Sequence, residues 1–280
     1  LPRAVVFCLR GTLYNTEVAY LFITSVFILG TIIGSFLNVV INRYGKESIQ
    51  GRSHCESCAR TLSPSELVPV ASFFLFRGRC AGCKTPISFQ YVFVELLTGA
   101  LFLLSFIAFG FSFEFVFSII IWSFLVVIAV YDFKHTIIPD EIVFSFIVVT
   151  FIRIIFLYGI RGLFIGGGLP YVLAGILFFI PFFLLWYLSK GTWMGLGDGK
   201  LVVGIGFFLG LERGISALLF AFWIGALISV FLLFMSRYLK LKFKGKSLTI
   251  KSEIPFGPFL ILGTGLVYFF DFNILTFLLS

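Results

Sequence analysis

Two aspartates lie in short polar segments of an otherwise apolar chain. Asp132 opens the segment Asp132-Phe-Lys-His-Thr-Ile-Ile-Pro-Asp140, and Asp198 follows 66 residues later within Met194-Gly-Leu-Gly-Asp-Gly-Lys200. An aspartate at the end of a membrane helix is costly unless it is hydrated or paired, so it usually has a function. Two carboxyls in one site cannot both ionise cheaply, which leaves one base and one acid. Such a pair can activate water against a peptide carbonyl while polarising the carbonyl oxygen, which is aspartyl proteolysis.

The residues that flank the aspartates fit this use. Gly195 and Gly197 remove side chains just before Asp198, so backbone or an extended substrate can approach closely. Pro139 lacks an N–H, which favours a turn or a new helix start with Asp140 in the first turn. We therefore expect Gly195, Gly197, Pro139 and Asp140 to support the site.

A simpler alternative is that the aspartates cap helices. Asp140 and Asp198 both stand near the start of an apolar run, where a carboxylate can accept backbone N–H groups. A cap does not need the Gly-x-Gly that precedes Asp198. Asp132 lies at the carboxyl end of its expected helix, where the helix dipole disfavours negative charge. Capping thus competes with a functional role chiefly at Asp140.

A second group of reactive side chains occupies the only long hydrophilic segment. Cys55 and Cys58 form one Cys-x-x-Cys pair, and 21 residues separate it from the pair of Cys80 and Cys83. Two such pairs can supply four thiolates to a tetrahedral zinc ion, and a site of this kind is structural because it has no open position. Two disulfides are the alternative, which a reducing compartment disfavours. His54 could replace a ligand, although a surface role is simpler.

Eight apolar helices are expected to position these groups. With 60% hydrophobic residues, 40 Phe, 12% charged residues and a mean hydropathy of +1.10, the chain cannot be an ordinary soluble domain. Apolar runs long enough to cross a bilayer recur along it. They cover about residues 18–41, 91–110, 115–131, 142–160, 170–188, 214–235 and 257–279, with a shorter Gly-rich run at about 200–211. The predicted fold class is an all-α polytopic membrane protein.

The basic residues predict the orientation of this bundle. With eight helices, 16 of the 21 Lys and Arg fall on one side, including the cysteine loop and both aspartate segments. Because positive residues are retained on the cytoplasmic side, we expect these segments to face the cytoplasm. The net charge of +8 is explained by this asymmetry and by anionic lipid, and it gives no indication of nucleic acid.

The same pattern predicts four segments. They are an N-terminal tail at 1–17, a first transmembrane helix at 18–42, a cytoplasmic four-cysteine zinc loop at 43–90 and a membrane-embedded domain at 91–280. The tail lacks the long apolar core and small-residue cleavage site of a signal peptide. Its Cys8 is left over as an unpaired cysteine.

Taken together, these motifs resemble the type IV prepilin peptidase family of GxGD-type membrane aspartyl proteases. The similarity runs from about residue 29 to 263, in the family's order and spacing, whereas residues 1–17 match nothing in the family. Besides the aspartate segments it rests on five stretches: Gly34-Ser-Phe-Leu-Asn-Val-Val-Ile-Asn-Arg43, Arg52-Ser-His-Cys55 with Cys58, Arg77-Gly-Arg-Cys80-Ala-Gly-Cys83, Tyr91-Val-Phe-Val-Glu95-Leu-Leu-Thr-Gly99 and Ile254-Pro-Phe-Gly-Pro-Phe259.

The resemblance implies an activity for each motif. Asp132 and Asp198 would be the catalytic pair, with Asp140 a supporting residue. The substrates would be type IV prepilins or pseudopilins in the bacterial inner membrane. Their short basic leader would be cut on the cytoplasmic side, between Gly and Phe.

The resemblance also implies a second reaction. Many members methylate the new pilin N-terminus with S-adenosylmethionine, and the presence of all four cysteines places this chain with that bifunctional type. Glu95 is the candidate residue for methyl transfer, although a buried acid paired with a loop Arg is an equally good account of it. No Gly-rich cofactor motif accompanies it.

Two functions of other classes compete with the peptidase. A small secondary transporter would use the acids as ion carriers, but transporter sites lie near the midplane on broken helices of repeated halves, and no repeat is visible here. A membrane scaffold that docks partners through its zinc loop would leave Asp132 and the Gly-x-Gly before Asp198 unexplained.

Overall fold

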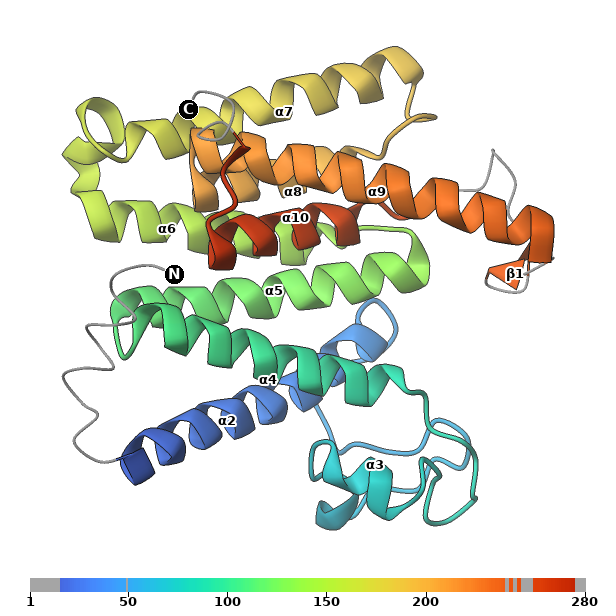
Figure 1. Cartoon of the computed structure of the whole chain (residues 1–280). Helices are drawn as coiled ribbons and strands as arrows, with labels where there is room; N and C mark the ends of the chain where they lie inside the picture. Colours follow the sequence, from blue (N-terminus) through green and yellow to red (C-terminus); the bar gives the residue numbers. More distant parts are fainter. Residues whose placement is uncertain (1–15, 49, 240–241, 244–245, 248–253, 275–280) are drawn as a thin grey trace. The chain divides into compact units, whose positions relative to one another are not determined.

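The structure is a computed structural model, and it describes residues 16–48, 50–239, 242–243, 246–247 and 254–274. The predicted tail at 1–17 therefore falls almost entirely outside the described residues, as does Cys8. The described chain is predominantly helical (Figure 1).

All eight predicted helices are present, which confirms the all-α membrane class. They are α2 (Thr16–Arg43), α4 (Gln90–Phe109), α5 (Phe113–His135), α6 (Asp140–Ile165), α7 (Leu169–Ser189), α8 (Leu196–Leu209), α9 (Leu211–Leu239) and α10 (Gly257–Phe270). In the described part of the chain, six of them are long and apolar enough to cross a bilayer: α2, α4, α5, α6, α7 and α9. Beyond these, the structure has the short elements η1 (Pro64–Glu66), α3 (Ala71–Leu75), β1 (Lys242–Phe243) and β2 (Lys246–Ser247).

The last helix is shorter than predicted. The apolar run at 257–279 was expected to form one helix, but α10 ends at Phe270 after 14 residues. Asp271 follows it with φ 55°, in the left-handed region, and its N–H bonds to the carbonyl of Val267. An aspartate tolerates this conformation better than most residues, so the helix terminates inside the apolar run.

The chain divides into two compact units, residues 1–127 and 128–280. In the first unit, α2 and α4 pack closely because glycines line their contact. A side-chain carbon on Gly30 would lie 2.7 Å from Gly99 Cα, and one on Gly34 would lie 2.8 Å from Glu95 Cα. Small residues let membrane helices approach in this way. A core of Val26, Phe102 and Phe115 packs these two helices against the start of α5 (Phe113–His135).

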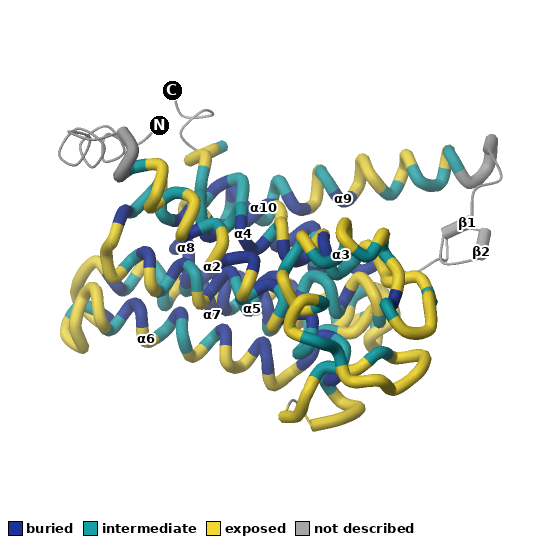
Figure 2. The backbone as a smooth tube through the Cα atoms, turned by 90° about the horizontal axis from the view of Figure 1, so that it is seen from below, coloured by how far each residue is buried: buried dark blue, intermediate teal, exposed yellow. Residues whose placement is uncertain are grey.

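The cysteine segment joins α2 to α4 in the first unit. It begins at Arg43, whose guanidinium donates to the carbonyls of Ser48, Gln50 and Arg52. The region around α3 is coloured mostly as exposed in Figure 2. It contains little regular structure, and polar contacts such as those of Arg43 link its residues.

The second unit is built around α8, which contacts α6, α7, α9 and α10 (Figure 1). Gly206 lets it approach α7, because a side-chain carbon there would lie 2.5 Å from Gly175 N. Gly204 makes room for the ring of Phe146 on α6. Near the carboxyl end of α8, the buried Arg153 of α6 donates to the carbonyl of Phe208 at 3.3 Å. Fourteen residues are too few to span the bilayer, so α8 is a buried helix that positions its own first turn.

Candidate functional site

Asp132 lies at the end of α5 and is held by another helix far along the chain. Its side chain is buried, with 4% of the residue exposed. The Oδ2 atom accepts the backbone N–H of Gly257 at 3.1 Å. Gly257 is the first residue of α10, so the carboxylate faces a helix N-terminus with its partial positive charge. The carboxyl end of α5 disfavours the negative charge of Asp132, and the N-terminus of α10 stabilises that charge instead.

Asp198 stands in the first turn of α8, beside the other carboxyl. The charge of Asp132 acts on the Asp198 carboxyl. The Asp198 carboxylate also accepts a hydrogen bond from the backbone N–H of Gly195, the N-cap residue of α8. Its Oδ1 atom is buried and has no hydrogen-bond partner among the described residues. The capping alternative thus accounts for one carboxylate oxygen of Asp198 and leaves the other without a structural role.

Ile138 fills the space between the two motifs. A side-chain carbon on Gly197 would lie 2.9 Å from Ile138 Cβ, and one on Gly257 would lie 3.5 Å from Ile138 Cδ1. The group that approaches Gly197 closely in the structure is thus the Ile138 side chain. Gly195 differs, since the nearest atom to a side-chain carbon there is Asp198 Oδ2 at 3.7 Å.

Asp140, which follows Pro139 at the end of the first aspartate segment, also contacts the second aspartate segment. Pro139 is the N-cap of α6, and Asp140 is its first residue, with no side-chain capping hydrogen bond. Asp140 Oδ1 instead lies 2.7 Å from Lys200 Nζ, within the second motif. Capping thus fails as the account of Asp140, which forms an ion pair between the first residue of α6 and the fifth residue of α8.

The four cysteines of the loop form a cluster suited to a metal ion. The sulfurs of Cys55, Cys58, Cys80 and Cys83 all lie within 4.8 Å of one another, and the four residues are free cysteines. Cys55 Sγ and Cys83 Sγ are 3.8 Å apart. Tetrahedral zinc with Zn–S bonds of about 2.3 Å separates its sulfurs by about 3.8 Å, so the cluster fits zinc. His54 is exposed and is not one of the clustered residues.

Two matching turns build this cluster. In the first, Cys55 N–H bonds to the carbonyl of Arg60, and in the second, Cys80 N–H bonds to that of Thr85. Each turn passes through a residue with positive φ directly after its second cysteine, Ala59 at 55° and Lys84 at 61°. The N–H groups of Cys83 and Gly82 lower the pKa of Cys80 to about 6, which favours the metal-binding thiolate.

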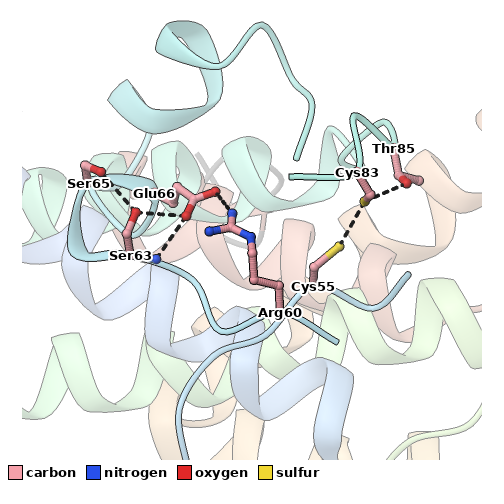
Figure 3. Close-up of polar contacts among 7 residues, drawn as sticks. All are labelled: Cys55, Arg60, Ser63, Ser65, Glu66, Cys83 and Thr85. Atoms are coloured by element: carbon pink, nitrogen blue, oxygen red, sulfur yellow. Dashed lines mark hydrogen bonds and ion pairs between the residues drawn. The ribbon is translucent and has the colours of Figure 1, made fainter. Parts of the chain in front are cut away.

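Arg60 connects the first turn to the rest of the loop (Figure 3). Its Nη2 atom lies 2.5 Å from Glu66 Oε1, and its side chain also bonds to Cys80 of the second turn. Glu66 in turn accepts the N–H and hydroxyl of Ser63 at 2.9 and 2.8 Å. The Ser63 N–H chiefly, together with Arg60, lowers the pKa of Glu66 to about 2. This chain of contacts places a positive charge against the thiolates.

Glu95 anchors the loop to α4 rather than pairing with a loop arginine. It is 7% exposed, and its Oε2 accepts the N–H of Val70 at 2.7 Å. Ser35 of α2 supplies a further hydrogen bond. In the described residues Glu95 forms no ion pair, so the predicted Arg partner is wrong while the predicted burial is confirmed.

The sequence did not predict the contacts that three residues make at the aspartate site. Gly257 entered only as part of a family-like stretch, although a Gly-Pro pair at the start of an apolar run indicates a helix N-terminus. No local pattern marks Ile138 as the contact between the motifs. Lys200 was recognised as part of the second motif, but its pairing with Asp140 depends on tertiary structure.

The fold and site define a multi-pass membrane protein with two carboxyls at helix ends, one buried and one half-buried, and a four-cysteine loop. Residues 28–109 match the model of the bacterial peptidase A24 N-terminal domain, and residues 119–230 match that of the type IV leader peptidase family. The chain belongs to the type IV leader peptidase family, and it is a multi-pass protein of the bacterial inner membrane.

Curated relatives carry the name prepilin leader peptidase/N-methyltransferase. The protein of Bacillus subtilis is 33% identical over 256 residues, which are 90% of this chain and 95% of the relative. That of Myxococcus xanthus is 33% identical over 76% of this chain and 64% of its own length. That of Neisseria gonorrhoeae is 30% identical over 72% of this chain and 78% of the relative. No solved structure matches the chain.

Proposed function

We propose that the Asp132–Asp198 pair cleaves the leader peptide of type IV prepilins or pseudopilins. One carboxylate takes a proton from water as the water attacks the scissile carbonyl, and the other carboxyl protonates or polarises the carbonyl oxygen. The observation that carries this proposal is a pair of interacting carboxyls: Asp132 is buried and held by the Gly257 N–H, and Asp198 is half-buried with its Oδ1 atom buried and without a hydrogen-bond partner. Family membership supports the reaction.

The substrate follows from the relatives' names and from the location of the pair. A prepilin carries an apolar helix that can lie in the bilayer and bring its cytoplasmic end to the depth of helix termini such as those of α5 and α8. The 16 cations on one side of the chain support a cytoplasmic location for the pair. We propose cleavage at a Gly-Phe junction, with Gly195, Gly197, Pro139 and Asp140 shaping the site.

The second activity is N-methylation of the pilin end that cleavage releases. It is assigned to the first transmembrane helix at 18–42 and the cytoplasmic loop at 43–90, while 91–280 forms the peptidase domain with the tail at 1–17 outside both. A structural zinc on Cys55, Cys58, Cys80 and Cys83 holds the loop. S-adenosylmethionine, when bound, supplies the methyl group. The names of the relatives support this activity.

The competing classes find less support. An ion carrier in a transporter would lie on a broken helix near the midplane, whereas Asp132 ends α5 and Asp198 opens α8. A scaffold would have no use for a carboxyl pair assembled from three separate helices.

Substitution of each carboxyl by its amide tests the peptidase. Asp132→Asn and Asp198→Asn should each lower cleavage of a Gly-Phe prepilin in membranes by about a hundredfold or more, because an amide cannot exchange the required proton. The exposed Asp271→Asn is the matched control and should cleave normally. Asp140→Asn should retain most activity, since the amide oxygen can still accept from Lys200. Near-normal cleavage by either Asp132→Asn or Asp198→Asn would overturn the mechanism.

A further inference from the structure

The cysteine loop exposes large apolar side chains beside the start of α4. Phe74 and Leu75 of α3 are 66% and 74% exposed, and Phe89, the N-cap residue of α4, is 63% exposed. We call these three residues the α3 patch. Scattered apolar side chains are normal on a protein surface, but several large ones in one short segment mark a contact with lipid or protein. The α3 patch therefore needs an occupant.

Phe73 joins α3 to the start of α4. Its ring lies edge-on to the rings of Phe74 and Phe89, with centroids 5.8 and 6.2 Å apart. Gly78 packs beside the Phe73 ring, and its N–H bonds to the carbonyl of Phe73 at 2.7 Å. The carbonyl of Gly78 in turn accepts the N–H of Ile87 at 2.7 Å. These contacts fix the position of the α3 patch relative to α4.

The α3 patch continues into an exposed apolar stripe of α4, a helix long and apolar enough to cross a bilayer. Phe93 and Leu96 follow Phe89 at helical spacing and are 51% and 39% exposed. Ile107 lies further along the same stripe and is 40% exposed. Because a membrane helix turns such a face to lipid, the stripe lies in the bilayer. Phe89, its first residue, then lies at the membrane surface where α4 enters.

The segment that carries the α3 patch has only positive charges. Arg77, Arg79 and Lys84 are all exposed, and the sequence contains no Asp or Glu between Glu66 and Glu95. An apolar surface flanked by cations matches an anionic bilayer, where apolar side chains enter the acyl boundary and Lys or Arg contact lipid phosphates. An apolar helix of a protein partner would cover the patch but would leave the three cations unused.

We infer that the α3 patch is a lipid-binding surface that holds the cysteine loop on an anionic bilayer. Phe74 and Leu75 enter the boundary between headgroups and acyl chains beside Phe89, while Arg77 and Arg79 contact the phosphates. The loop is thereby kept at the membrane surface, at the level where α4 enters the bilayer. Neither prepilin nor a cofactor is needed for this contact.

Photo-crosslinking from the α3 patch identifies its occupant. A benzoyl-phenylalanine replaces Phe74, and the purified full chain is irradiated in nanodiscs of phosphatidylethanolamine and phosphatidylglycerol, without prepilin. Mass spectrometry should find phospholipid adducts at about tenfold the yield from the same photoreactive residue at Thr61, which is exposed in the same loop outside the patch. Phosphatidylglycerol should be labelled about threefold beyond its share of the bilayer, and Arg77→Gln combined with Arg79→Gln should remove this preference.

Leu75 offers a matched pair of variants. With the photoreactive residue at position 74, Leu75→Ser should lower the phospholipid adducts by about fivefold or more, whereas Leu75→Met should retain them. Because Leu75 is exposed, both variants should elute from gel filtration as the unsubstituted protein does. Equal phospholipid adducts from positions 74 and 61, or no effect of Leu75→Ser, would overturn the inference. Adducts that join two copies of the chain, or that shift from lipid to added prepilin, would show instead that the α3 patch binds protein.

Discussion

The cysteine loop and the aspartate pair assemble their reactive groups in opposite ways. The four cysteines lie within one connecting segment, and each pair is shaped by hydrogen bonds between residues at most five positions apart. The aspartate site instead joins α5, α8 and α10, and the bond from Gly257 to Asp132 links residues 125 positions apart. Local spacing is therefore sufficient to recognise the first site, whereas the second depends on how helices pack.

The two sites also differ in their relation to water. Cys58 and Cys83 are exposed, and the loop around them contains the Arg60–Glu66 ion pair. Asp132 is 4% exposed and held by helices that pack through glycines. Because the sites lie in different compact units and use different forces, a change in one should leave the other working.

The largest effect is expected from Gly257→Ala. A side-chain carbon at this position would lie 2.7 Å from Asp132 Oδ2, so the carboxyl must move away. Since the displaced atom ends a flexible side chain, the fold should survive while leader cleavage falls by about a hundredfold. Methylation of a pre-cleaved pilin should continue, and both rates can be followed by mass spectrometry. Normal cleavage by Gly257→Ala would show that the α10 N-terminus does not position the pair.

Removal of zinc should abolish methylation and leave leader cleavage largely intact. A chelator, or Cys→Ser at Cys55, Cys58, Cys80 or Cys83, should loosen the loop, because four-thiolate zinc contributes folding free energy directly. We expect methylation to be lost and prepilin cleavage to stay within a few-fold of normal. Limited proteolysis between residues 43 and 90 and metal analysis report the state of the loop. Absence of zinc from intact, reduced protein would contradict this prediction.

Alanine substitutions at the two glycines before Asp198 should lower leader cleavage to different extents, with effects smaller than that of Gly257→Ala. Gly197→Ala would place a carbon 2.9 Å from Ile138 Cβ, a branched atom near the backbone that cannot easily move. Cleavage should fall by about tenfold or more as the two motifs separate. Gly195→Ala meets only ordinary contacts and should fold normally. A large loss of cleavage in Gly195→Ala, at normal stability, would instead place the substrate against that residue.

The smallest effect concerns Glu66 in the loop. Its carboxyl has a pKa lowered to about 2, so it stabilises the folded loop above the unfolded pKa of about 4.3. That stabilisation disappears as the pH falls from about 4.3 toward 2. Glu66→Gln should therefore release zinc to a chelator a few-fold faster than the unsubstituted protein at pH 7. The comparison is made at pH 7, where both the Glu66 carboxylate and the zinc-binding thiolates are available. Equal release rates from Glu66→Gln and the unsubstituted protein would exclude a stabilising role of the Glu66 carboxylate.

Much of the fold follows from sequence for a simple physical reason. Lipid requires long apolar helices, so runs of apolar residues predict them directly, and all eight predicted helices are present. The prediction was wrong at Asp271, where the helix ends inside the predicted run, because averaged hydropathy contains no information on φ. At Gly197 the absence of a side chain indicated a close approach, but the sequence did not show that Ile138 makes it.

The sequence by itself determined the membrane class, the cysteine cluster and the family, since each depends on composition or on spacing along the chain. Only the tertiary structure decided that Gly257 holds Asp132, that Lys200 pairs with Asp140 and that Ile138 fills the space beside Gly197. It also decided that Phe73 joins α3 to Phe89 at the start of α4. These contacts join residues far apart in sequence, and their partners are set by the packing of whole helices rather than by any local pattern.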